Sequence, residues 1–166
     1  EWCLMASGSW NGWAGDTPAH MSAWCKQEMG WVEPMVLDGD QISVNFPDAV
    51  NNDYALKIWE DDYHWSRYFL VENRQLTGFD SGLPGDGLMI YHVDENSRWG
   101  PNLWSSGSVN DDHSHKLVDV EEADGLADLD NSVNRGDGGD PFPGSSSNFT
   151  FDSNSNPNSG RYNGGA

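Results

Sequence analysis

Acidic side chains concentrate in residues 111–140, which hold ten carboxylates against one lysine and one arginine. Within this segment, ADGLADLD (123–130) and GDGGDP (136–141) place carboxylates at short offsets beside glycines, which permit the tight turns that gather such groups. Ca²⁺ takes about six to eight oxygen ligands, several of them from carboxylates on loops. The segment therefore predicts a calcium site. Its predicted ligands are Asp124, Asp137 and Asp140, followed by Asp128 and Asp130.

A second interpretation of the same residues is a solvated acidic loop. The spacing does not match an EF-hand, which needs alternating acids, a glycine and a closing glutamate. The whole chain of 166 residues carries 27 acids and 8 bases, for a net charge of −19. Either solubility or bound cations accounts for such a charge. It argues against nucleic acid and anionic membranes as partners, because phosphate binding needs a basic surface.

The five histidines do not form an evident metal site. His92 is the one candidate, because it lies in an apolar run of strand length and is followed by Asp94 and Glu95. His113 and His115 would share a face if their segment is extended, which permits metal binding, but a structural role is the favoured interpretation for each histidine. The chain has no His-Glu-x-x-His motif, no Gly-x-Ser-x-Gly motif and no Walker loop. No complete catalytic set is therefore predicted.

Cys3 and Cys25 are the only cysteines, and the sequence leaves their pairing open. A bridge between them would indicate an oxidising compartment. Residues 148–150 (NFT) match the N-glycosylation pattern at Asn148. No run of about 20 apolar residues is present, so no membrane-spanning segment is predicted.

One helix is predicted over residues 17–29. Asp16 is a capping residue, Pro18 stands in the first turn, where proline costs no hydrogen bond, and Gly30 is a natural stop. Apolar residues recur through the segment at helical spacing. They are Met21, Trp24, Cys25 and Met29.

Four segments have the length and patterning of β-strands. They are 41–46, 54–59, 66–74 and 88–93. The connections between them are too short for helical crossovers, which predicts mostly antiparallel pairing. The segment 66–74 is apolar on both faces and is expected to be central in its sheet. Strands and one helix together predict an α+β fold with long loops.

Composition changes after Gly144, where the chain becomes rich in Ser, Asn and Gly. We expect residues 1–144 to form one structural unit and residues 145–166 to run over its surface as a tail. The end of the tail has no closing strand signal, which favours a fragment of a larger domain.

Several blocks of the sequence resemble, in order, the immune inhibitor A family of secreted zinc metallopeptidases. The resemblance covers about residues 1–144. The blocks are WCLMASGSW (2–10), PAHMSAWCK (18–26), YFLVENRQ (68–75), GDGLMIYHVD (85–94), VDVEEADG (118–125) and GDGGDPF (136–142).

The resemblance implies a zincin-like C-terminal subdomain of a catalytic domain. Family members are secreted endopeptidases with structural calcium, and their zinc ligands lie on a His-Glu-x-x-His helix that this chain lacks. That helix would lie just before Glu1. Met5 matches the methionine of the turn beneath the zinc, where a thioether offers a soft apolar floor and is not a ligand. The implied partners are a protein or peptide substrate and the missing N-terminal half, and this chain alone should be inactive.

A non-catalytic module is the rival interpretation. The nine tryptophans, the β-rich pattern and the acidic loop also suit a calcium-stabilised extracellular module that binds carbohydrate or forms an assembly. Most of these tryptophans are expected to lie in the core or in a cleft wall. The residues before Glu1 would separate the two interpretations.

Overall fold

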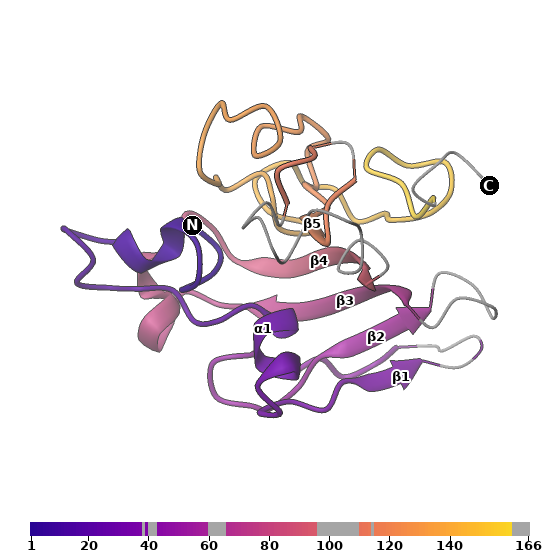
Figure 1. Cartoon of the computed structure of the whole chain (residues 1–166), viewed down its shortest axis with the longest axis horizontal. Coiled ribbons are helices and arrows are strands. Elements are labelled where there is room, and N and C mark those ends of the chain that lie inside the picture. The colour runs from indigo at the N-terminus through magenta and orange to yellow at the C-terminus, as the bar shows by residue number, and fades with distance from the viewer. Residues whose placement is uncertain (38, 40–42, 60–65, 96–109, 114, 161–166) are drawn as a thin grey trace.

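The computed structural model describes residues 1–37, 39, 43–59, 66–95, 110–113 and 115–160. One five-stranded sheet runs through these residues in the order β1-β2-β3-β4-β5 (Figure 1). Its strands are β1 (Met35–Leu37), β2 (Leu56–Trp59), β3 (Arg67–Arg74), β4 (Gly87–Asp94) and β5 (Val118–Val120). The helical elements are α1 (Ala23–Glu28) and the 3₁₀ turns η1 (Ser7–Trp10) and η2 (Gly78–Gly82).

The sheet confirms the α+β class and the mostly antiparallel pairing. Only β1 and β2 pair in parallel, and the other three neighbouring pairs are antiparallel. The predicted central strand is confirmed, because β3 is the middle strand of the five. β3 and β4 pair over their whole lengths, from Arg67 opposite Asp94 to Arg74 opposite Gly87.

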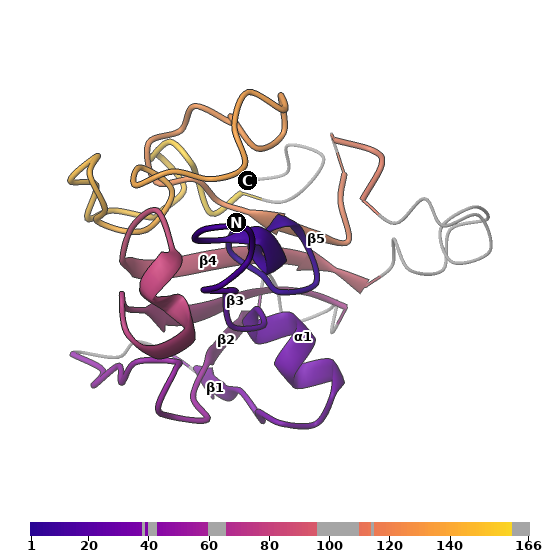
Figure 2. The same ribbon diagram turned by 90° about the vertical axis from the view of Figure 1, so that its left-hand side faces the viewer.

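Both faces of the sheet are covered, which explains the apolar runs 68–71 in β3 and 88–91 in β4. Alternate residues of each strand point to opposite faces. Tyr68 and Leu70 pack in one core under the N-terminal segment and α1, with Trp2 and Ala23. Residues of the opposite parity pack in a second core under the C-terminal loops, which Figure 2 shows on the side of the sheet near β5. Its buried members are Leu56, Phe69, Val71, Ile90, Ala123 and Phe142.

The predicted helix start is wrong by about six residues. α1 begins at Ala23, after Ser22, whose side chain accepts the N–H of Cys25 (3.4 Å). Asp16 instead closes the preceding turn by accepting the N–H of Trp13 (2.7 Å). The intervening segment is not helical, because its backbone bonds to distant groups: the N–H of His20 donates to Asp80 Oδ1 (2.8 Å). Long-range hydrogen bonds thus override the local signal.

Two short strands were not predicted, and one predicted strand is not formed where it is described. Residues 43–46 of the expected strand 41–46 are not in a strand, and positions 41 and 42 lie outside the described residues. Phe46 instead packs as a loop side chain, and its carbonyl accepts the Asn73 amide (2.9 Å). β1 and β5 are three residues long, too short for alternation to identify them.

Within the described residues, no helix is long and apolar enough to cross a membrane.

Candidate functional site

Three acidic side chains come together beyond the end of β5. Glu122, Asp124 and Asp140 each offer one carboxylate oxygen, and these oxygens lie within 4.8 Å of one another. Two backbone hydrogen bonds bring the segments together, from the N–H of Ala123 to Asp140 O (2.9 Å) and from the N–H of Asp124 to Gly139 O (3.1 Å). Two of the five predicted calcium ligands therefore meet here, beside a glutamate that was not predicted.

The loop that carries Asp140 folds through its own polar groups. Asp137 Oδ1 accepts the N–H of Gly139 (2.6 Å), and its other oxygen accepts the Asn134 amide (2.8 Å). Phe142 anchors the end of the loop, because it exchanges two N–H···O bonds of 2.8 Å with Leu88 of β4. Asp137 thus shapes the loop, and it does not belong to the cluster of three.

Asp140 is fully buried. Its Oδ2 accepts the indole N–H of Trp2 (2.6 Å) and the N–H of Asp137 (3.0 Å). Its Oδ1 is buried and has no hydrogen-bond partner in the described part of the chain. A buried carboxylate oxygen without a partner is costly unless a cation or a proton satisfies it.

Burial raises the pKa of both enclosed carboxyls. For Asp140, burial is the main cause of the raised pKa, and the negative charges of Asp137 and Asp124 add to it. For Glu122, burial raises the pKa to about 7, although its carboxylate accepts the N–H groups of Asp128 (2.7 Å) and Leu129 (3.0 Å). Like charges held together out of water disfavour ionisation, which a bound cation would reverse.

The cluster could hold a hard cation such as Ca²⁺. All its donors are carboxylate oxygens, which hard cations prefer. Gly139 leaves the space open: a Cβ there would overlap the Asp124 carboxylate and lie 3.0 Å from Asp137 Oδ1. Glu122, Asp124 and Asp140 are the residues that would hold the ion, and the unpartnered oxygen of Asp140 is the observation that points to one.

The remaining predicted ligands have other partners. Asp128 Oδ2 accepts the Asn134 amide (3.2 Å). Asp130 forms an ion pair with Lys116, which also pairs with Asp119 (2.8 Å). Glu122 was not predicted, and its only signal in the sequence is its place two residues before Asp124. The two residues lie in one turn, in which the N–H of Gly125 donates to Glu122 O (2.8 Å).

His92 lies away from this cluster, on the second core. Its Nδ1 is 3.2 Å from Glu121 Oε1, and its ring packs 4.4 Å from that of Phe69. His115 pairs instead with Asp94 (2.7 Å). Among the described residues, the only group of three or more close metal-binding side chains is the acidic one, and it contains no histidine or cysteine. These residues therefore do not fit a zinc site.

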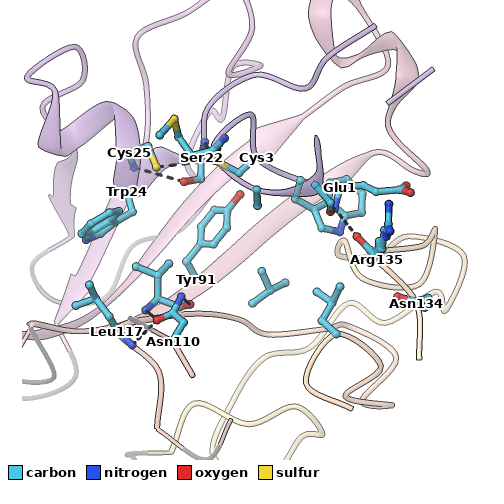
Figure 3. Close-up of a pocket in the computed structure, with 17 residues that line it drawn as sticks. Glu1, Cys3, Ser22, Trp24, Cys25, Tyr91, Asn110, Leu117, Asn134 and Arg135 are labelled. Carbon is cyan, nitrogen blue, oxygen red and sulfur yellow. Dashed lines mark hydrogen bonds between the residues drawn. The ribbon is translucent and has the colours of Figure 1, made fainter. Parts of the chain in front are cut away.

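Met5 stands at a pocket of about 420 Å³ between the N-terminal segment, α1, β4 and β5 (Figure 3). The Met5 side chain is 70% exposed, although methionine is ordinarily buried. Much of the pocket wall is apolar, with Trp24, Leu117 and Leu129 among its side chains. The pocket and the acidic cluster are connected, because Trp2 lines the pocket and donates its indole N–H to Asp140.

A buried ionic network supports the turn at residues 4–6, which we call the Met5 turn. Arg74 is fully buried, and its guanidinium donates to both oxygens of Asp80 (2.6 Å each) and to Glu72 Oε1 (2.9 Å). It also donates to the backbone carbonyl of Trp2 (2.8 Å). The same network thus fixes the chain three residues before Met5.

The network extends to α1 and β4 through Glu72. Lys26 of α1 lies 2.8 Å from Glu72 Oε2, and the Tyr91 hydroxyl donates to Glu72 Oε1 (2.7 Å). Burial raises the pKa of Tyr91, and the charge of Glu72 adds to that shift. Two positive and two negative side chains therefore compensate one another inside the core, as buried charges must.

The chain matches no protein-family model, no curated protein and no solved structure.

The raised pKa of Glu122 predicts that the calcium-free protein loses stability as pH rises. The pKa of the Glu122 carboxyl is 4.5 in the unfolded chain and about 7 in the folded protein. Between these two pH values, the folded state keeps a proton that the unfolded state has released. The contribution is complete below pH 4.5, is lost as pH passes 7, and amounts to at most about 3 kcal/mol. In EDTA, we expect the melting temperature to fall by several degrees between pH 5 and pH 8.

Glu122→Gln is the matched control, since the amide keeps the shape of the carboxyl and does not titrate. The pH-dependent fall in its melting temperature should be several degrees smaller than that of the wild type. An equal fall in both proteins would contradict the assignment of this titration to Glu122.

Proposed function

We propose that this chain is part of a secreted zinc metalloendopeptidase of the immune inhibitor A type. In this proposal it contributes the turn with Met5, a wall of the substrate cleft and loops stiffened by calcium. We also propose that the fold is that of a zincin-like C-terminal subdomain. The observation that carries it is an exposed methionine at the rim of an apolar pocket, in the position where the family resemblance places the methionine turn.

The turn that presents Met5 is firmly held. The N–H of Ala6 donates to Cys3 O (3.0 Å), and the N–H of Leu4 donates to His20 O (3.3 Å). The Arg74 network fixes Trp2 on the other side. An apolar side chain on such a rigid turn is suited to pack against a further segment of protein, because exposed methionine gains contacts when it is covered.

Calcium would act on the pocket through two contacts. Asp140 accepts the Trp2 indole, and Glu122 accepts the N–H of Leu129 (3.0 Å). Both Trp2 and Leu129 line the pocket. An ion held by Glu122, Asp124 and Asp140 would therefore stiffen the pocket wall without taking part in chemistry.

Peptide hydrolysis would depend on residues outside this chain. Its described residues do not fit a zinc site, so we assign no catalytic step to them. In the intact enzyme, zinc would activate the water that attacks the peptide bond. Residues 1–166 expressed alone should therefore hydrolyse no protein substrate, such as casein.

The coding sequence immediately upstream of Glu1 tests the proposal most cheaply. We expect it to encode a His-Glu-x-x-His helix with a further acidic ligand. A complete upstream sequence without this motif would refute the peptidase proposal for this protein, whatever the behaviour of the calcium site.

A carbohydrate-binding module is the second candidate, and exposed tryptophans favour it. Trp10 is 66% exposed and Trp13 is 87% exposed, and tryptophan faces stack on sugar rings. A glycan array and a casein digest with the whole protein separate the candidates. Glycan binding without proteolysis would favour the module, whereas proteolysis that depends on zinc would favour the peptidase.

A further inference from the structure

The two cysteines of the chain meet at the edge of the pocket. Cys3 comes from the N-terminal segment and Cys25 from α1, and their sulfur atoms lie 3.8 Å apart (Figure 3). Both are free thiols in this structure, both are partly buried and both line the pocket. Cys3 and Cys25 are 22 positions apart in the sequence, so the fold brings them into contact.

The backbone places the Cys3 sulfur for reaction. It accepts the N–H of Met5 (3.4 Å) and the N–H of Ser22 (3.3 Å), and Ser22 also caps α1 at Cys25. The hydrogen bond with Cys25 is the largest cause of a lowered Cys3 pKa, and the same contact raises the pKa of Cys25. The two N–H donors to its sulfur stabilise a thiolate at Cys3, and the thiolate is the reactive form.

We propose that Cys3 and Cys25 form an intramolecular disulfide that fastens the Met5 turn to α1. The oxidant is a low-molecular-weight disulfide such as oxidised glutathione. The Cys3 thiolate attacks one of its sulfur atoms, and one glutathione thiolate leaves. Cys25 then gives up its proton and attacks the Cys3 sulfur, and the second glutathione leaves. The two cysteines together lose two electrons and two protons. These electrons and protons reduce the glutathione disulfide to two glutathione thiols.

The bridge would restrain the unfolded chain and one wall of the pocket. It would close a loop from the Met5 turn to the first turn of α1, and such a constraint stabilises mainly by lowering the entropy of the unfolded state. Neither calcium nor peptidase activity is needed for it, so its test is independent of the proposed function.

The test equilibrates residues 1–166 with excess oxidised glutathione, removes the glutathione, and counts thiols by alkylation in denaturant. We expect no alkylated cysteine and a monomer on a non-reducing gel. After treatment with a phosphine reductant, both cysteines should be alkylated, and the melting temperature should fall by about 5–10 °C. A single bound glutathione, a disulfide-linked dimer or two free thiols after oxidation would overturn the proposal.

Single and double serine variants provide the control. Cys3→Ser and Cys25→Ser should each resemble the reduced wild type in melting temperature, as should the double variant. The reductant should change none of them by more than about 1 °C. A shift on reduction that persists in the double variant would show that the cysteines do not cause it, and would also overturn the proposal.

Discussion

Removal of calcium is expected to lower the melting temperature of this protein by roughly 5–10 °C. A ligand that binds only the folded state stabilises it by about 2.7 kcal/mol at a hundredfold excess over its dissociation constant. One kcal/mol corresponds to about 2–4 °C for a chain of this size. The stabilisation arises because the ion would satisfy the buried oxygen of Asp140 and offset the repulsion among Glu122, Asp124 and Asp140. Differential scanning fluorimetry in EDTA, with and without added calcium, measures it.

Two variants make this prediction specific to the cluster. Asp140→Asn keeps an oxygen for the Trp2 indole and removes the charge, so calcium should no longer shift its melting temperature. Asp111→Asn removes a charge from an exposed residue and should leave the calcium shift intact. A calcium shift of equal size in Asp140→Asn, or none in the wild type, would contradict a structural calcium ion at this cluster.

Asp80→Ala is expected to destabilise the fold by about 3–5 kcal/mol, because it leaves the Arg74 guanidinium buried without its bidentate partner. It also removes the acceptor of the His20 N–H, which holds the segment before α1 in a non-helical conformation. Urea unfolding, followed by tryptophan fluorescence, measures the loss as a lower midpoint at an unchanged slope.

Asp86→Ala is the matched control, since Asp86 is an exposed acid in the loop that follows η2. Its free energy of unfolding should stay within about 0.5 kcal/mol of the wild type. If Asp80→Ala were to cost less than about 1 kcal/mol, the network around Arg74 would not be the support of the Met5 turn that its geometry indicates.

Of the strands that sequence patterning predicted, the two whose bounds agree best with the structure, β3 and β4, are also the most deeply buried. β3 and β4 are apolar on both faces because two cores enclose them, so their signal is strong and local. α1 was predicted in the right place but with the wrong start, since Ser22 and not Asp16 caps it. The start depends on the contact between His20 and Asp80, 60 residues apart, which no local pattern contains.

The candidate metal site was predicted only in part, because contacts between distant segments also decide which residues belong to it. Glycine-rich acidic segments indicated Asp124 and Asp140, but the pairing of 123–124 with 139–140 decides which oxygens meet. That pairing brings in Glu122 and leaves Asp130 with Lys116. The Arg74 network had no sequence signal at all, because alternating charges at the end of a strand ordinarily face solvent. Here the N-terminal segment and η2 cover them.

Hydrolysis of casein by the whole protein in which residues 1–166 occur tests the proposed function most directly. The rate would be measured before and after treatment with 1,10-phenanthroline, which removes zinc, and again after zinc is restored. We predict hydrolysis that the chelator abolishes and zinc restores, with calcium present throughout. No hydrolysis by the folded whole protein, or hydrolysis that the chelator leaves unchanged, would contradict the assignment to a zinc metallopeptidase.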